Sequence, residues 1–157
     1  MDFLSKRINS ISNGQKASRR QVVCCLSNSV ETSVFHDGAF KLLNTSLSIL
    51  QREGYIRSFN FSIIKRFVKR KKISYSGVEV NSLYLTINLK YDSVGNSVIY
   101  TIFRASTPAR RVFITSKSFW QPQTFSGIFV VSTSRGIITD IEARSLNLGG
   151  ELLFGVV

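Results

Sequence analysis

The chain has 157 residues, 43% of them hydrophobic, and its 21 lysines and arginines against 9 aspartates and glutamates give a net charge of +12. A chain of this length buries roughly 68–70% of the surface that its unfolded form exposes, so it can fold as one domain or as two small subdomains sharing a core. The composition excludes wholesale disorder, and the charge predicts a polyanionic partner, either nucleic acid or an anionic membrane surface.

Two features argue against a membrane and an oxidising compartment. The longest apolar run, residues 152–157, is far shorter than the about 20 residues of a spanning helix. The only cysteines, Cys24 and Cys25, are adjacent. Adjacent cysteines rarely form a structural disulfide, and two thiolates do not complete a zinc site. We therefore interpret them as small apolar residues of a strand in a reducing compartment, and we expect no membrane partner.

The chain begins with a predicted helix. Leu4, Ile8 and Ile11 recur at helical spacing, and Gly14 predicts the end of the helix. The five cations among residues 1–20 would also suit a mitochondrial presequence. We interpret the segment as part of the fold.

A strand and a long helix follow. The apolar run at residues 21–26 predicts a strand, and residues 27–38 have turn chemistry with little periodicity. An apolar stripe predicts a helix over residues 40–53, with Gly54 as its left-handed stop. This stripe is typical of a helix that packs on a core.

Residues 60–80 break the pattern. Six cations occupy eight positions between Lys65 and Lys72. Like charges this close repel one another, which disfavours a compact segment. The run is either a solvated loop or a finger that contacts RNA, and we favour contact.

A hairpin is predicted next. Residues 83–89 alternate between apolar and polar side chains, as a half-buried strand does. Residues 92–96 form a turn, and residues 98–103 are expected to return as the partner strand.

The remaining elements are short. Thr139 and Glu142 fit a capping box, which predicts a helix of about two turns from Asp140. Strands are expected at residues 112–115, 127–132 and 152–157, with a loop over residues 116–125.

Groups for catalysis are sparse. His36, the only histidine, stands beside Asp37, but the turn-rich segment assigns no nucleophile to this pair. No phosphate-binding loop ends in Gly-Lys-Ser/Thr, and the acids are scattered. We therefore predict no catalytic residue, metal, cofactor or small-molecule substrate. A hydrolase or transferase built on His36 remains an alternative.

A loop of small hydroxyl residues is the strongest candidate site. Ser132, Thr133 and Ser134 can donate to phosphates and accept from ribose 2′-hydroxyls. Arg135 can pair with phosphate, and Gly136 lets the backbone approach closely. An ordinary Ser/Thr turn after a strand is the alternative.

This loop carries a family resemblance. Residues 132–136 with the following 137–140, and Gly149-Gly150-Glu151 near the end, resemble two signatures of the eighth protein of the small ribosomal subunit, in its bacterial and organellar form. The resemblance implies an α+β fold of two subdomains, residues 1–80 and 81–157, packed as helix, sheet, sheet, helix. The stretches near 27–38 and 60–80 then read as insertions in the first subdomain.

The resemblance also implies a function. Such a protein binds the central domain of small-subunit rRNA through the minor groove and the sugar–phosphate backbone, beside other small-subunit proteins, and supports subunit assembly and translation. Shape and 2′-hydroxyl readout suit A-form RNA, whose major groove is too narrow for side chains. Gly149, Gly150 and Glu151 are expected to support the hydroxyl loop rather than to touch RNA.

Further contacts are expected at two other places. The segment from Ser106 to Arg111 resembles a basic family segment, but Thr107 and Ala109 depart from it. The first helix has serines where the family has arginines. Its RNA contacts are therefore expected to be weaker or to come from other cations near this helix. The residues predicted to bind RNA are Ser132, Thr133, Ser134, Arg135, Gly136, Ser106, Arg110, Arg111, Lys6, Arg7, Lys69, Arg70, Lys71 and Lys72.

One binding alternative and the compartment stay open. A general single-strand nucleic-acid module would stack bases on exposed aromatics, for which Tyr84, Phe113 and Trp120 are candidates. The 12 phenylalanines and the many Ser, Ile and Asn residues fit an AT-rich genome. With the two insertions, this bias favours a mitochondrial ribosome over a plastid or bacterial one.

Overall fold

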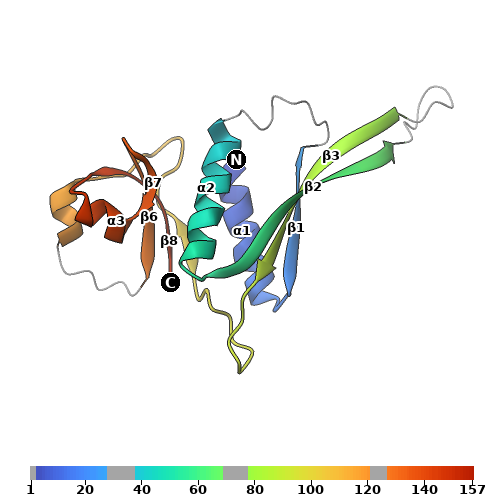
Figure 1. Cartoon of the computed structure of the whole chain (residues 1–157), viewed down its shortest axis with the longest axis horizontal. Helices are drawn as coiled ribbons and strands as arrows, with labels where there is room; N and C mark the ends of the chain where they lie inside the picture. Colours follow the sequence, from blue (N-terminus) through green and yellow to red (C-terminus); the bar gives the residue numbers. More distant parts are fainter. Residues whose placement is uncertain (1–2, 28–37, 69–77, 121–126) are drawn as a thin grey trace.

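The computed structural model describes residues 3–27, 38–68, 78–120 and 127–157, with the backbone alone at 66–68, 78–81 and 120. Its elements are, in chain order, α1 (Phe3–Lys16), β1 (Gln21–Ser27), α2 (Gly38–Arg52), β2 (Ile56–Val68), β3 (Val78–Leu89), β4 (Ile102–Arg104), β5 (Phe113–Ile114), η2 (Ser116–Trp120), β6 (Ile128–Thr133), β7 (Gly136–Thr139), α3 (Asp140–Ser145) and β8 (Gly150–Val156) (Figure 1).

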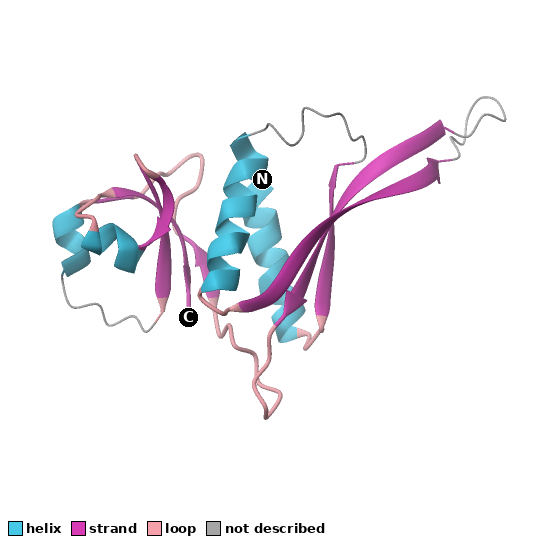
Figure 2. Cartoon of the chain, viewed as in Figure 1, coloured by secondary structure: helices cyan, strands magenta, loops and turns pink. Residues whose placement is uncertain are grey.

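Two antiparallel sheets confirm the predicted α+β class. The first has the order β1-β3-β2, and the second has the order β4-β8-β6-β7 with β5 added on β8. Figure 2 shows α1 and α2 between the two sheets, with α3 on the outer face of the second sheet. The layers therefore run helix, sheet, helix pair, sheet, and not helix, sheet, sheet, helix as expected.

The shared core explains this order. Ile8 and Leu47, from the two central helices, belong to one hydrophobic cluster with Leu85 of the first sheet and with Val130 and Phe154 of the second. α2 is buried over a broad face and not along one narrow stripe, so it packs on elements at both sides. A second, smaller cluster lies under α3 and η2.

The predicted hairpin of residues 83–89 with 98–103 is wrong. β3 pairs with β1 and β2, whereas β4 pairs with β8 in the other sheet. The predicted turn does form, because Tyr91 bridges Ser97, but the chain then crosses to the second sheet. The expected boundary between residues 80 and 81 falls inside β3, so the sheets divide the chain after Leu89.

Gly14 does not end the first helix. α1 continues to Lys16, and a Cβ atom at Gly14 would lie 2.3 Å from the Val22 side chain of β1. The glycine is therefore needed where the helix packs closely on a strand. Gly54 does adopt the predicted left-handed conformation, with φ +80°, just after α2.

The capping box of α3 is confirmed. The Thr139 hydroxyl accepts from the Glu142 N–H at 3.3 Å, and the Glu142 carboxylate accepts from the Thr139 N–H at 3.2 Å. Glu142 also pairs with Arg52 of α2 at 2.9 Å, which joins the central helices to α3. Burial acts to raise the pKa of Glu142, but the Thr139 hydrogen bond and Arg52 outweigh it and hold that pKa below its ordinary value.

The expected insertion at residues 60–80 is largely a β-ribbon. β2 extends to Val68 and β3 starts at Val78, so the two strands run past the end of β1 as a pair (Figure 1). The cluster of six cations thus begins inside β2. Lys69 to Lys72, and residues 28–37 of the insertion expected near 27–38, lie outside the described residues.

Candidate nucleic-acid interface

The hydroxyl loop is a closed turn between β6 and β7. The Thr133 hydroxyl donates to the Gly136 carbonyl at 2.9 Å and accepts from the Arg135 N–H at 3.3 Å. Gly136 has φ +118°, a conformation that residues with a Cβ atom rarely adopt. These bonds fix the turn and leave Ser134 and Arg135 exposed at its tip.

The three hydroxyls of the turn differ in whether they are hydrogen-bonded within the chain. The Thr133 hydroxyl is committed to the turn itself. Within the described part of the chain, the hydroxyls of Ser132 and Ser134 have no hydrogen-bond partner. Ser132 and Ser134 can therefore offer both a donor and an acceptor to a ligand.

The double glycine supports this turn from beside it. A Cβ atom at Gly150 would lie 2.2 Å from the Ser132 carbonyl oxygen, and one at Gly149 would lie 2.7 Å from the Ile114 carbonyl oxygen. Only glycines let β8 enter between β6 and β5 at these distances. Glu151 then pairs in register with Ser132.

Glu151 carries an ion pair at the surface. Its carboxylate accepts from the Arg111 guanidinium at 2.7 Å, and the side chain of Glu151 is only 15% exposed whereas that of Arg111 is 59% exposed. The acid therefore orients the arginine without presenting its own charge to solvent. The supporting role of Glu151 toward the hydroxyl loop stays a prediction.

The segment from Ser106 to Arg111 divides into two parts. Ser106 is fully buried, and its hydroxyl accepts from the Val112 N–H at 2.9 Å. We therefore assign Ser106 to holding the loop and withdraw it as an RNA contact. Thr107 and Arg110 exchange two backbone hydrogen bonds that close a tight turn. The Arg110 side chain is exposed on this turn.

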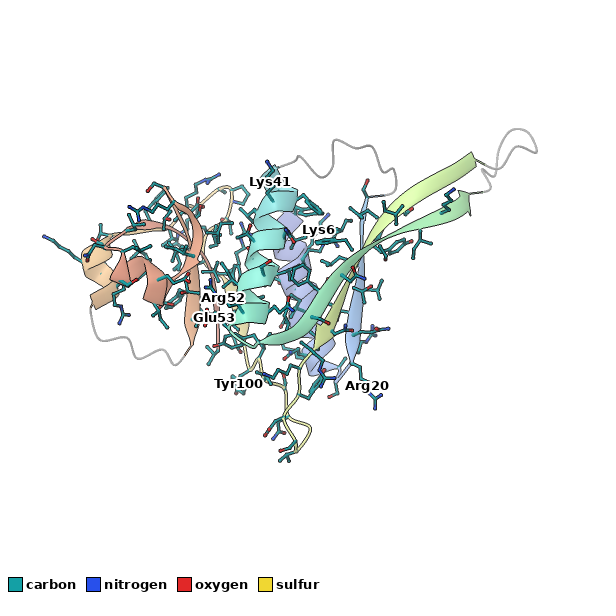
Figure 3. All side chains as sticks on the ribbon, in the orientation of Figure 1. Lys6, Arg20, Lys41, Arg52, Glu53 and Tyr100 are labelled. Atoms are coloured by element: carbon teal, nitrogen blue, oxygen red, sulfur yellow. The ribbon has the colours of Figure 1, made fainter. Side chains whose placement is uncertain are left out.

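A groove of about 300 Å³ brings these residues together with the two central helices. The first turns of α1 and α2 form one wall, and the N-terminus of a helix carries the positive end of its dipole. Figure 3 shows Lys6 and Lys41 toward this end of the helices. The lining residues are Phe3, Leu4, Gly38, Ala39, Leu42, Arg104, Thr107, Pro108, Arg111, Ser132, Glu151 and Leu153.

The two cations predicted in the first helix differ. Lys6 is exposed. Arg7 donates to the Cys25 carbonyl at 2.7 Å and lies 5.2 Å from the centre of the Phe3 ring. Its guanidinium therefore ties α1 to β1.

The remaining candidates do not gather at the groove. Tyr84 lies in β3 of the first sheet, whereas Phe113 is 71% exposed in β5 of the second sheet. His36, Asp37 and the Trp120 side chain lie outside the described part of the chain. Within that part, no three His, Cys, Asp or Glu side chains cluster as metal ligands would, and no helix has the length and hydropathy to cross a bilayer.

Comparison with known proteins identifies the family. The profile described as Ribosomal protein S8 matches residues 2–157. The chain belongs to this family. Small ribosomal subunit protein uS8 of Rhodospirillum centenum is 36% identical over 154 residues, which cover 97% of this chain and 94% of that protein. The proteins of the same name from Rhizobium rhizogenes and Sinorhizobium fredii are 37% and 38% identical, each covering 99% of this chain and 96% of the relative.

Membership of the S8 family confirms the predicted resemblance and the expectation that the chain is not an enzyme. Two contributors to the groove were missed from the sequence. One is Arg104 of β4, whose Nε donates to the Ser106 carbonyl. The other is the pair of helix N-termini, which only the layer order brings beside Ser132.

Proposed function

We propose that the chain is a structural constituent of the small ribosomal subunit that binds the central domain of small-subunit rRNA and supports subunit assembly and translation. The proposal rests on membership of the S8 family and on the names of the relatives, which are small ribosomal subunit proteins. Neighbouring small-subunit proteins are its further partners.

The β6–β7 turn carries this proposal. It presents Ser134 and Arg135 at a rigid tip, and Ser132 beside it lines the groove. Hydroxyls that donate and accept suit ribose 2′-hydroxyls and phosphates, which a wide, shallow RNA minor groove displays. A rigid tip also loses little conformational entropy on binding.

The charge of the groove supports the same ligand. Arg104 and Arg111 line it, and Arg110 and Lys6 are exposed nearby. Among the described residues that line the groove, Glu151 is the one acid, and it is paired with Arg111. These lining residues therefore offer cations and helix dipoles to a phosphate backbone.

Ser134→Ala tests the proposal. If the hydroxyl satisfies a buried partner on the RNA, its loss should weaken binding to the cognate central-domain rRNA helix by about 1–3 kcal/mol. Ser93→Ala is the matched control, because Ser93 is also an exposed turn serine but lies in the loop after β3. Filter binding or fluorescence anisotropy at fixed salt gives both affinities. Wild-type affinity in Ser134→Ala would contradict the assignment of the turn.

A general single-strand binder is the second candidate, because Phe113 is 71% exposed and pairs in register with Glu151. An exposed ring can stack on a base of any sequence. Competition between the duplex-like rRNA helix and a homopolymer separates the two functions. Equal competition would favour the single-strand module.

For the compartment, we propose a mitochondrial ribosome, with a plastid or bacterial ribosome as alternatives. The support is the composition, with its 12 phenylalanines, and the two expected insertions near residues 27–38 and 60–80. Copurification of the tagged chain with a small subunit of known origin tests it. Recovery with the cytoplasmic subunits of a bacterium would refute the mitochondrial assignment.

A further inference from the structure

A second basic recess lies at the other end of α1 from the groove. It has a volume of about 660 Å³ and is lined by Arg20, Gln21, Arg57, Asn88, Leu89, Tyr91 and Asp92. Phe3, at one end of α1, lines the groove, and Arg20 follows the other end. A helix of 14 residues is about 21 Å long, so one ligand segment in the groove does not fill the recess. Figure 3 shows Lys6 and Arg20 at these opposite ends.

The two arginines flank the end of the central strand of the first sheet. The Leu89 N–H of β3 donates to the Arg20 carbonyl on one side, and Leu89 pairs with Ile56 on the other. Because neighbouring strands are about 4.8 Å apart, the backbones at Arg20 and Ile56 are about 10 Å apart across Leu89, and Arg57 follows Ile56 at a register shift of β2. Both side chains are exposed, and neither has an ion-pair partner within the described part of the chain.

Hydrogen bonds hold the walls of the recess. The Tyr91 hydroxyl donates to the Arg19 carbonyl at 2.6 Å, and Asn88 Nδ2 donates to the Ser58 hydroxyl at 2.8 Å. Asp92, the one acid among the described lining residues, accepts from its neighbour Ser93 N–H at 2.7 Å. The carboxylate is therefore engaged by its own turn, whereas the arginines remain available.

The sheet face beside the recess has the chemistry of a sugar–phosphate ligand. α1 and α2 cover the opposite face of this sheet (Figure 1). Within residues 21–25, 58–62 and 84–88, the outward positions carry uncharged side chains: Gln21, Val23, Cys25, Ser58, Asn60, Ser62, Tyr84, Thr86 and Asn88. Such a face repels no phosphate and can exchange hydrogen bonds with riboses.

We propose that Arg20 and Arg57 clamp the phosphate backbone of a second RNA segment, separate from the segment bound at the β6–β7 turn. The cations at both sides of the recess and the uncharged Gln21 and Asn88 between them favour RNA over a protein partner. The inference rests on the proposed function only in its choice of RNA. Its site shares no residue with the groove.

The double variant Arg20→Gln/Arg57→Gln tests the clamp. The probes are an in vitro transcript of the cognate small-subunit rRNA, free of protein, and the isolated central-domain helix. Loss of two charge-assisted contacts should weaken binding to the long transcript roughly 10- to 100-fold and lower its salt slope by about two. Binding to the isolated helix should stay within about twofold.

Two single variants sharpen the result. Asp92→Asn keeps the acceptor for Ser93 but removes the negative charge that Asp92 places in the recess, so it should tighten binding to the long transcript. Lys117→Gln removes an exposed cation in η2 and should change neither probe. Arg20 and Arg57 are exposed, so circular dichroism should show that the double variant is folded.

Several outcomes would overturn the clamp. Unchanged affinity for the protein-free transcript would leave the recess to a protein partner or to solvent. An equal loss on the isolated helix would show that no second segment is involved. Ser134→Ala should weaken both probes, so failure of the proposed function and failure of the clamp give different patterns.

Discussion

Replacing Gly150 with alanine tests how the hydroxyl turn is held in place. The added Cβ atom would lie 2.2 Å from the Ser132 carbonyl oxygen and 2.9 Å from its carbonyl carbon. A relaxed carbon–oxygen contact needs about 3.3 Å, so β8 and β6 must separate by about 1 Å at this point. Both neighbours are backbone atoms, which cannot turn away as a side chain can.

The expected cost follows from this geometry. Overpacking a buried site costs about 1–3 kcal/mol, and each lost backbone hydrogen bond adds about 1 kcal/mol. We therefore expect Gly150→Ala to lower the free energy of unfolding by about 2–4 kcal/mol, measured by urea denaturation. Binding to the rRNA helix should also weaken where the variant is still folded, because Ser132 and Glu151 pair across this contact.

Two other glycines provide graded controls. Gly38 in α2 has no atom within 4 Å of an added Cβ, so Gly38→Ala should be nearly neutral. At Gly155 the Cβ atom would meet the Phe103 ring at 2.6 Å, and this ring is 36% exposed and can rotate. Gly155→Ala should therefore lower the free energy of unfolding by an intermediate amount, about 0.5–1.5 kcal/mol. If Gly150→Ala were as mild as Gly38→Ala, the close approach of β8 to Ser132 would not be structurally required.

Two further changes address other parts of the molecule. Glu142→Gln keeps the capping box but removes the ion pair with Arg52, so the free energy of unfolding should fall by about 0.2–1 kcal/mol at pH 7. The pKa of Glu142 is lower in the folded state, so the wild type should be more stable than Glu142→Gln above the unfolded pKa of about 4.3. This difference in free energy of unfolding should vanish as pH falls through the folded pKa. A difference that persists at about pH 2 would contradict the reasoning. Replacing the four lysines within residues 65–72 by glutamine should flatten the salt dependence of rRNA binding, and an unchanged slope would leave that run as a solvated loop.

The sequence predicted local structure better than strand partners. The Thr139–Glu142 capping box and the Gly54 stop depend on residues close together in the chain, so both can be predicted from the local sequence. The alternation at residues 83–89 shows a strand with one buried face, but it does not show which strand lies beside it. The wrong hairpin followed from choosing the next strand in sequence, whereas the first-sheet partners of β3 are β1 and β2.

The candidate site shows the same limit at the level of single atoms. The sequence indicates that hydroxyls and cations gather near residues 106–111 and 132–136. It does not indicate that the buried Ser106 hydroxyl accepts a hydrogen bond from the Val112 N–H, or that Arg7 donates one to the Cys25 carbonyl. Side chains of the same type differ in availability because their partners come from elsewhere in the fold.

The layer order makes the groove a property of both halves of the chain. One wall comes from α1 and α2, and the other comes from the second sheet. Leu4 and Leu153 line the groove and also belong to the shared hydrophobic core, where each is only 3% exposed. The width of the groove therefore depends on how the central helices pack on the second sheet. A core substitution far from the hydroxyl turn can change RNA affinity by moving one wall, even when the turn keeps its own hydrogen bonds.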